Sequence, residues 1–203
     1  MSLHSYIAKQ FRDPAGTGGK LVSAVMNRQN RPLYEETIRL LSPSNSDSIL
    51  DIGCGNGTVL NMLANQCNCD LTGIDTSMSI LKDATKRNCT FVKKGKMTFL
   101  CQNANAMTFA DQSFSKAYTI NTVYFWESLG DTMAEIERVL KPGGLFINTL
   151  YTNETLHSFA HTQFGYKQFT TEQLVSAGAD AGFIADVVPI QNGDAYCIIY
   201  RRS

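Results

Sequence analysis

The residues of this chain that are best placed to do chemistry lie between Ser48 and Thr58. An apolar run, Ile49 to Ile52, leads directly into glycines at alternate positions, namely Gly53, Gly55 and Gly57. Glycine permits sharp backbone turns and lets a ligand approach the main chain without a Cβ in between. A helix that begins here would direct its amide groups and its positive dipole end at the ligand. The segment therefore predicts a binding loop that favours an anionic group.

A carboxylate follows this loop after about 20 residues, which is the spacing expected of a ribose-binding acid. The next expected strand, residues 70–74, ends at Asp75. A carboxylate at such a strand end can accept hydrogen bonds from both hydroxyls of a ribose. The loop and Asp75 together predict a cofactor that contains a nucleoside.

The spacing of the glycines discriminates between cofactors. The dinucleotide fingerprint has glycine at its first, third and sixth positions, whereas here the third glycine is at the fifth position and Thr58 is at the sixth. Asp51 stands two residues before the first glycine. This combination resembles motif I of the class I S-adenosylmethionine-dependent methyltransferases, specifically the small-molecule branch of the methyltransferase type 11 group. The resemblance extends over residues from about 34 to 203.

The resemblance implies roles for residues outside the loop. Asp75 is expected to bind the ribose, and Thr76 to lie beside the adenine. Asn103 stands where the family usually has Asp, and its side-chain carbonyl can still accept a hydrogen bond from the adenine amino group. The cofactor-binding residues implied in this way are Asp51, Gly53, Gly55, Gly57, Asp75, Thr76, Asn103, Ala104 and Asn121.

The acceptor side is less specific in the sequence. Methyl transfer from a sulfonium mainly requires that donor and acceptor are held in line, and a general base is needed only if the acceptor must lose a proton. Aromatic residues there either stack on the acceptor or seat the following helix. Histidines four residues apart would share a helix face and act either as a base or in a surface or packing role. The acceptor-side candidates are Tyr124, Trp126, His157 and His161.

The expected function is therefore S-adenosylmethionine-dependent methyl transfer to a small-molecule acceptor. One alternative is a methyltransferase-like protein that binds S-adenosylmethionine without turnover. Another is an NAD-dependent oxidoreductase, which the glycine spacing disfavours. A ligand-shift measurement with S-adenosylmethionine, its demethylated product and NAD separates these hypotheses.

Composition restricts the partners. The chain has 203 residues, of which 43% are hydrophobic, and its 18 Lys and Arg balance 18 Asp and Glu, so no basic field favours nucleic acid. The chain shows neither an apolar run of the roughly 20 residues that span a bilayer nor a signal peptide, and we expect no membrane partner and a cytoplasmic location. The six cysteines are expected to be free thiols. No metal site is expected, because Cys67 and Cys69 form a C-x-C rather than a zinc-binding C-x-x-C.

The predicted fold must bring these residues to one edge of a sheet. Alternating signals predict parallel strands at 48–52, 70–74, 97–101, 115–121 and 145–151, and helices at 57–66, 77–87 and 132–140, with a short helix near Met107. A helix from Thr171, with Thr170 as its cap, precedes two strands, 183–190 and 195–201, that flank an Asn-Gly turn, which is a hairpin signal. The predicted fold is α/β, a Rossmann-like, doubly wound, seven-stranded and mostly parallel sheet that ends in an antiparallel hairpin.

The chain is expected to divide near residue 31. Residues 1–31 are predicted to form an N-terminal helical arm, with a helix at 18–30, that acts either as a lid or as a fixed packing element. Residues 32–203 are predicted to form the methyltransferase domain.

Overall fold

A computed structural model describes residues 25–159, 162 and 165–203 of the chain. Most of the expected N-terminal arm and His161 lie outside the described residues. Residues 25–29 are helical, and the next helix begins at Arg31. The division of the chain near residue 31 stays a prediction.

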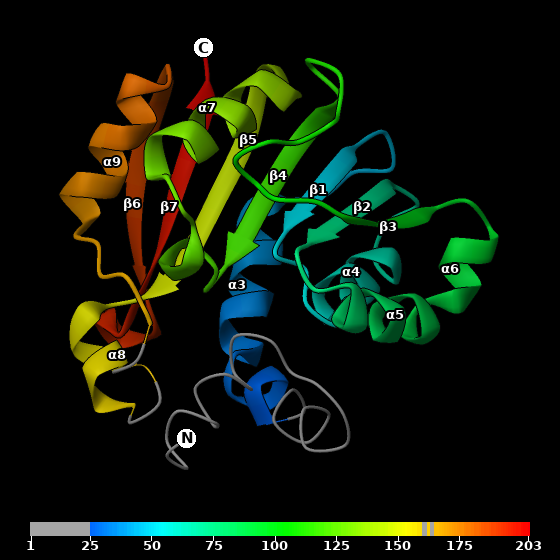
Figure 1. Cartoon of the computed structure of the whole chain (residues 1–203), viewed down its shortest axis with the longest axis horizontal. Coiled ribbons are helices and arrows are strands. Elements are labelled where there is room, and N and C mark those ends of the chain that lie inside the picture. Colours follow the sequence, from blue (N-terminus) through cyan, green and yellow to red (C-terminus); the bar gives the residue numbers. More distant parts are fainter. Residues whose placement is uncertain (1–24, 160–161, 163–164) are drawn as a thin grey trace.

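The described strands form one sheet of seven in the order β3-β2-β1-β4-β5-β7-β6 (Figure 1). The first five run parallel, and β7 lies antiparallel between β5 and β6. Their bounds are β1 (Ser48–Ile52), β2 (Asp70–Asp75), β3 (Met97–Cys101), β4 (Phe114–Ile120), β5 (Leu140–Tyr151), β6 (Phe183–Ile190) and β7 (Ala195–Arg202). This confirms the predicted Rossmann-like sheet with a closing hairpin.

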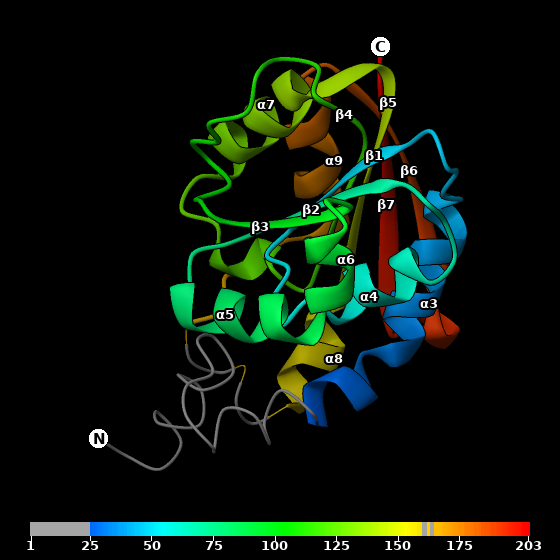
Figure 2. The ribbon, with the colours of Figure 1, turned by 90° about the vertical axis from the view of Figure 1, so that its right-hand side faces the viewer.

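Helices cover both faces of this sheet (Figure 2). One face packs on apolar residues of α3, α4 and α5, and the other on residues of α7, α8 and α9. Adjacent residues of β1 alternate between the two clusters, Ile49 in the first and Leu50 in the second, as the two-residue period of a strand requires. The described α-helices are α3 (Arg31–Leu41), α4 (Thr58–Ala64), α5 (Met78–Arg87), α6 (Cys89–Lys93), α7 (Leu129–Val139), α8 (Asn153–Ser158) and α9 (Thr171–Asp180).

Side-chain caps set several helix starts. The Thr170 hydroxyl accepts from the Gln173 amide, and the Gln173 side chain accepts from the Thr170 amide, which confirms the predicted cap. The Ser128 hydroxyl accepts from the Asp131 amide, so α7 begins at Leu129, earlier than the expected residue 132.

The expected short helix near Met107 is wrong. Its backbone is bound instead by side chains of α7: the Met107 amide donates to Glu135 Oε2 at 2.8 Å, and Arg138 Nη2 donates to the Met107 carbonyl at 3.0 Å. These bonds replace the intrahelical bonds that a helix would supply. Helix α6 was not predicted.

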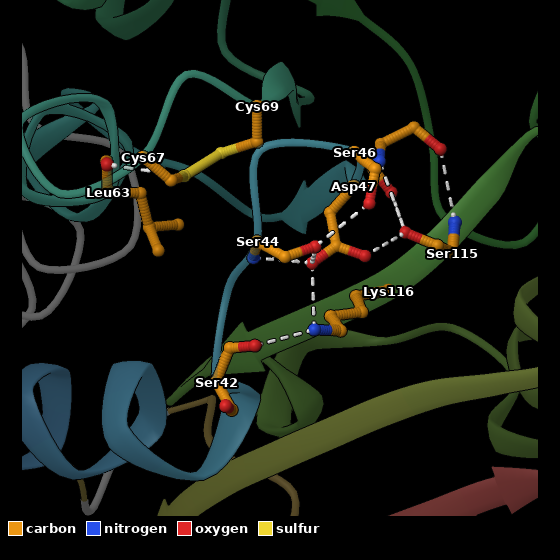
Figure 3. Close-up of polar contacts among 10 residues, drawn as sticks. Ser42, Ser44, Ser46, Asp47, Leu63, Cys67, Cys69, Ser115 and Lys116 are labelled. Atoms are coloured by element: carbon orange, nitrogen blue, oxygen red, sulfur yellow. Dashed lines mark hydrogen bonds and ion pairs between the residues drawn. A yellow bond between two sulfur atoms is a disulfide. The ribbon is translucent and has the colours of Figure 1, made fainter.

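The expectation of six free thiols is wrong for one pair. Cys67 and Cys69, in the bend between α4 and β2, form a disulfide (Figure 3). Their Cα atoms are 5.4 Å apart, within the range that a disulfide bridges, and a spacing of two residues does not by itself indicate such a bend. The remaining cysteines, Cys54, Cys89, Cys101 and Cys197, are free.

Candidate cofactor and acceptor site

A cavity of about 400 Å³ opens where β1, β2 and β4 end. Its size is that of a small-molecule site, and the carboxyl edge of a doubly wound sheet is where such ligands bind. Eight of the nine predicted cofactor-binding residues line it, together with Tyr124 and Trp126 from the acceptor-side candidates. The fold thus brings together residues from several strand ends that are far apart in the sequence.

Gly53 occupies a position that only glycine can fill. Its φ is +76°, and a Cβ there would lie 2.4 Å from Thr122 Cγ2. The amides of Gly53 and Cys54 both donate to the Ile74 carbonyl, at 2.8 and 3.0 Å. These bonds tie the glycine loop to the end of β2.

A Cβ would find room at Gly55 but not at Gly57. A Cβ on Gly55 would meet nothing closer than 3.8 Å, and the residue lines the cavity. Gly57 is the N-cap of α4 and is absent from the cavity lining. A Cβ on Gly57 would lie 2.7 Å from the side chain of Asn88 and 2.9 Å from Phe99. The third glycine is therefore required by packing behind the loop.

Asp75 links the loop to the start of α5. Its Oδ2 accepts from the Gly55 amide at 3.0 Å, and its Oδ1 accepts from the Ser77 amide at 2.9 Å. A carboxylate has about four lone-pair sites, so accepting these two backbone bonds is compatible with binding ribose hydroxyls as well. Thr76 lines the cavity beside it.

Asp51 is a carboxyl group at the cavity wall with only 4% of its surface exposed. Tyr118, its register partner on β4, donates a hydrogen bond to Oδ2 at 2.7 Å. Burial, with a smaller contribution from the charge of Asp75, raises the pKa of Asp51 to about 7, although the hydrogen bond from Tyr118 lowers it. A cationic group in the cavity would favour the ionised form. No local pattern pointed to Tyr118, because the pairing of β1 with β4 joins residues far apart in the chain.

Asn103 and Ala104 line the cavity on the side of β3. The Asn103 side chain accepts from the Asn105 amide at 3.4 Å, which is a long hydrogen bond. Its carbonyl therefore retains acceptor capacity for a ligand.

Asn121 lines the cavity directly after β4. It has a φ of +57°, and its Oδ1 accepts from the Tyr124 hydroxyl and from the Tyr151 amide, both at 3.3 Å. The side-chain Nδ2 of Asn121 lies 3.4 Å from Asn30 Oδ1. This oxygen also accepts from the Tyr151 hydroxyl at 3.0 Å. Asn121 thus contacts Tyr124 and Tyr151 on the acceptor side and Asn30, the residue before α3. These contacts were not predicted.

An aromatic wall lines part of the cavity. It comprises Tyr124, Phe125, Trp126, Tyr151, Phe159 and Tyr166, and Tyr34 and Tyr118 also line the cavity. The rings of Phe125 and Tyr166 have centroids 4.7 Å apart, and those of Tyr151 and Phe159 are 5.5 Å apart. Burial raises the pKa of Tyr166 to about 12 and also raises the pKa of Tyr124 and Tyr151. These hydroxyls stay protonated at neutral pH and act as neutral hydrogen-bonding groups.

Of the two histidine candidates, the structure describes only His157, which is not brought to the cavity. His157 is exposed, does not line it, and has its Nε2 3.2 Å from Gln168 Nε2. Helix α8 ends at Ser158, and His161 lies outside the described residues, so the expectation of a shared helix face stays a prediction. Among residues 25–159, 162 and 165–203, no group of three potential metal ligands lies together. No helix in the same residues is long and apolar enough to cross a bilayer.

Comparison with known proteins identifies this arrangement. Residues 50–148 match the family described as "Methyltransferase domain", and this segment contains the glycine loop, Asp75 and the wall at 121–127. The matched segment is a methyltransferase domain of the class I S-adenosylmethionine-dependent type. S-adenosylmethionine is the cofactor of that family, and the loop, the carboxylates and the amide-lined edge of the cavity suit its amino-acid, ribose and adenine parts.

This chain is similar to curated proteins that are named as methyltransferases. It is 35% identical over 103 residues to "O-methyltransferase resE" of Aspergillus sclerotiorum, which is 51% of this chain and 39% of that protein. It is 28% identical over 182 residues to "Sterol 4-C-methyltransferase strm-1" of Caenorhabditis elegans, covering 84% and 52%. The match thus spans 39% of the first relative's length and 52% of the second's.

A solved structure agrees with the fold. The geranyl diphosphate C-methyltransferase of Streptomyces coelicolor A3(2), in complex with Mg²⁺, geranyl-S-thiolodiphosphate and S-adenosyl-L-homocysteine, superimposes with a TM-score of 0.74 at 16% identity. The match covers 94% of this chain and 83% of that one. At this identity the likeness supports the fold of the sheet and its helices.

Proposed function

We propose that this methyltransferase transfers the methyl group of S-adenosylmethionine to a small, largely apolar acceptor. The observation that carries the proposal is a cavity that joins the glycine loop and two carboxylates to an aromatic wall. The relatives named as O-methyltransferase and sterol C-methyltransferase support an acceptor of this class.

The proposed roles follow from the two kinds of residue that line the cavity, the polar residues and the aromatic wall. When bound, S-adenosylmethionine supplies a methyl group that its sulfonium charge has already activated. Asp75 would bind the ribose hydroxyls, Asn103 and the Ala104 amide would bind the adenine edge, and Asp51 would face the ammonium of the amino-acid end. The polar lining would therefore hold the donor, with its methyl group directed toward the aromatic wall.

The aromatic wall would orient the acceptor and exclude water. Stacking on the Tyr124, Trp126 and Tyr166 side chains suits a flat or unsaturated molecule, and holding it in line is the main requirement of the displacement. Because their pKa values are raised, the tyrosine hydroxyls would hold an acceptor oxygen by hydrogen bonds rather than remove its proton. Acceptors that are already nucleophilic fit this wall best.

Calorimetry with S-adenosylmethionine, S-adenosylhomocysteine and NAD tests the donor half of the proposal. We expect both adenosyl ligands to bind and NAD to bind far more weakly; tighter binding of NAD would overturn it. Release of S-adenosylhomocysteine during incubation with sterols and with phenols tests turnover. Binding without release for any acceptor would instead support the alternative of a binding protein.

The lid role of residues 1–31 stays a prediction. Met26, Asn27 and Asn30 line the cavity, which supports a covering role for the end of this arm. Hydrogen exchange across residues 5–30, with and without S-adenosylhomocysteine, checks it: protection gained with ligand indicates a lid, and equal protection indicates a fixed element.

A further inference from the structure

Two segments that are far apart in the chain build one part of the aromatic wall. The loop after β4, residues 122–127, supplies Tyr124, Phe125 and Trp126, and the segment before α9 supplies Tyr166. The Tyr166 ring centroid lies 4.7 Å from that of Phe125 and 5.6 Å from that of Tyr124. The shape of this wall therefore depends on how the two segments are held together.

Lys167 fastens these segments by three hydrogen bonds. Its Nζ donates to the Trp126 carbonyl at 2.6 Å and to the Glu127 carbonyl at 2.9 Å, and its backbone amide donates to the Tyr124 carbonyl at 3.1 Å. Lys167 forms no ion pair with any residue that the structure describes, and it does not line the cavity. Its ammonium thus donates hydrogen bonds to two carbonyls of a single loop.

The bonding of Lys167 suits a residue that fixes a loop. The carbonyls of Trp126 and Glu127 follow a single turn of 3-10 helix, Val123–Phe125, where backbone carbonyls lack helical partners. An ammonium offers three donors on a flexible stem, and hydrogen bonds from a charged donor are roughly twice as strong as neutral ones. One lysine can therefore hold both carbonyls while its neighbour Tyr166 packs on the rings.

We propose that Lys167 is a positioning residue of the acceptor pocket, which acts through Trp126 and Tyr166 without contacting either substrate. This inference rests on the proposed function, because it takes the aromatic wall as the acceptor side. The glycine loop and Asp75 belong to other strand ends and make none of these bonds. Loss of the Lys167 ammonium should loosen the acceptor wall and leave cofactor affinity unchanged.

Tryptophan fluorescence reads this effect directly, because Trp126 is the one tryptophan of the chain and only 7% exposed. Lys167→Met keeps the stem and removes the donors. We expect a red-shifted emission and about a twofold rise in acrylamide quenching, as local opening admits solvent, with the urea midpoint and the S-adenosylhomocysteine affinity unchanged. Lys167→Arg should restore most of the quenching protection.

Lys141→Met is the matched control, since Lys141 is exposed at the opposite end of β5. Unchanged emission and quenching in Lys167→Met, or equal changes in Lys141→Met, would overturn the proposal. The measurement uses the protein without ligand, so it is independent of turnover. Failure of the proposed function would appear separately, as absence of S-adenosylhomocysteine binding by the unmutated protein.

Discussion

Two aspartates at opposite ends of β1 both expose little surface, yet their pKa values are shifted in opposite directions. Asp47, just before the strand, is 9% exposed, and Asp51, within it, is 4% exposed. Burial raises the pKa of Asp47, but hydrogen bonds from Lys116, Ser115 and Ser44 outweigh it and leave this pKa below its ordinary value (Figure 3). Asp51 has the neutral Tyr118 hydroxyl as its hydrogen-bond donor, and its pKa rises to about 7. Asp51 is the more deeply buried of the two and has the weaker set of donors, and the balance of these two effects decides the sign of the shift.

The difference separates a structural edge from a functional one. At the amino end of the sheet, Asp47 binds β1 to β4 through Ser115 Oγ at 2.8 Å and Lys116 Nζ at 2.8 Å. At the carboxyl end, Asp51 lies beside a cavity and forms no ion pair within the described part of the chain. Incomplete compensation of a buried charge is typical of binding sites, and a cationic ligand would complete it.

The largest expected effect is that of Asp51→Asn on stability. The pKa of Asp51 is about 7 in the folded protein, against an ordinary value of 3.8, so between these values the folded protein holds a proton that the unfolded chain has released. The free energy of unfolding therefore falls as pH rises from about 4 to about 7. Removing the carboxyl should raise the free energy of unfolding at pH 8 by up to about 4 kcal/mol, as measured by urea unfolding.

The same substitution should act in the opposite direction on ligand binding. The amide introduced by Asp51→Asn cannot ionise, so we expect weaker binding of S-adenosylmethionine at pH 8 and a flatter pH dependence of affinity in this variant. A stability difference that stays constant between pH 5 and pH 8 would contradict the raised pKa of Asp51.

Lys116→Met tests the structural end of the comparison. It removes the cation from a pair whose side chains are 19% and 10% exposed, and leaving a buried charge without its partner costs about 3 kcal/mol. Urea unfolding should show this loss, while affinity for S-adenosylhomocysteine stays unchanged. Lys96→Met breaks the exposed pair with Asp70 and should cost less than about 1 kcal/mol; equal losses in the two variants would refute the distinction.

Asp75→Ala tests the ribose assignment. Loss of charge-assisted hydrogen bonds should weaken S-adenosylmethionine binding by roughly 1–3 kcal/mol, as measured by calorimetry. Asp75→Asn is the milder control, because its carbonyl can still accept one of the backbone bonds from Gly55 or Ser77. Unchanged affinity in the alanine variant would rule out this role.

Asn103→Asp should have the smallest effect. A charged acceptor at the adenine edge should keep or improve cofactor affinity, by up to about 1 kcal/mol. Asn103→Ala is the comparison, and if it leaves affinity untouched in the same titration, Asn103 does not bind the adenine.

Local signals explain how much of the fold was predictable. The capping pair of Thr170 and Gln173 and the turn at Asn192 act within a few residues, so α9 and the final hairpin were predicted nearly to their ends. Met107 was mispredicted because side chains of α7, some thirty residues away, bind its backbone. Bonds of that kind leave no periodic pattern in the sequence.

The sequence alone determined the order of the seven strands along the chain, the glycine loop and the position of Asp75 at a strand end, since alternation, glycine spacing and strand ends are local properties of a chain. Only the tertiary structure decided which residues share the cavity. It joined Tyr118 to Asp51 through the β1–β4 pairing, assigned Gly57 to packing, and placed Lys167 beside the loop that carries Trp126. Each of these results depends on contacts between segments far apart in the chain, which strand register and packing fix and no local pattern encodes.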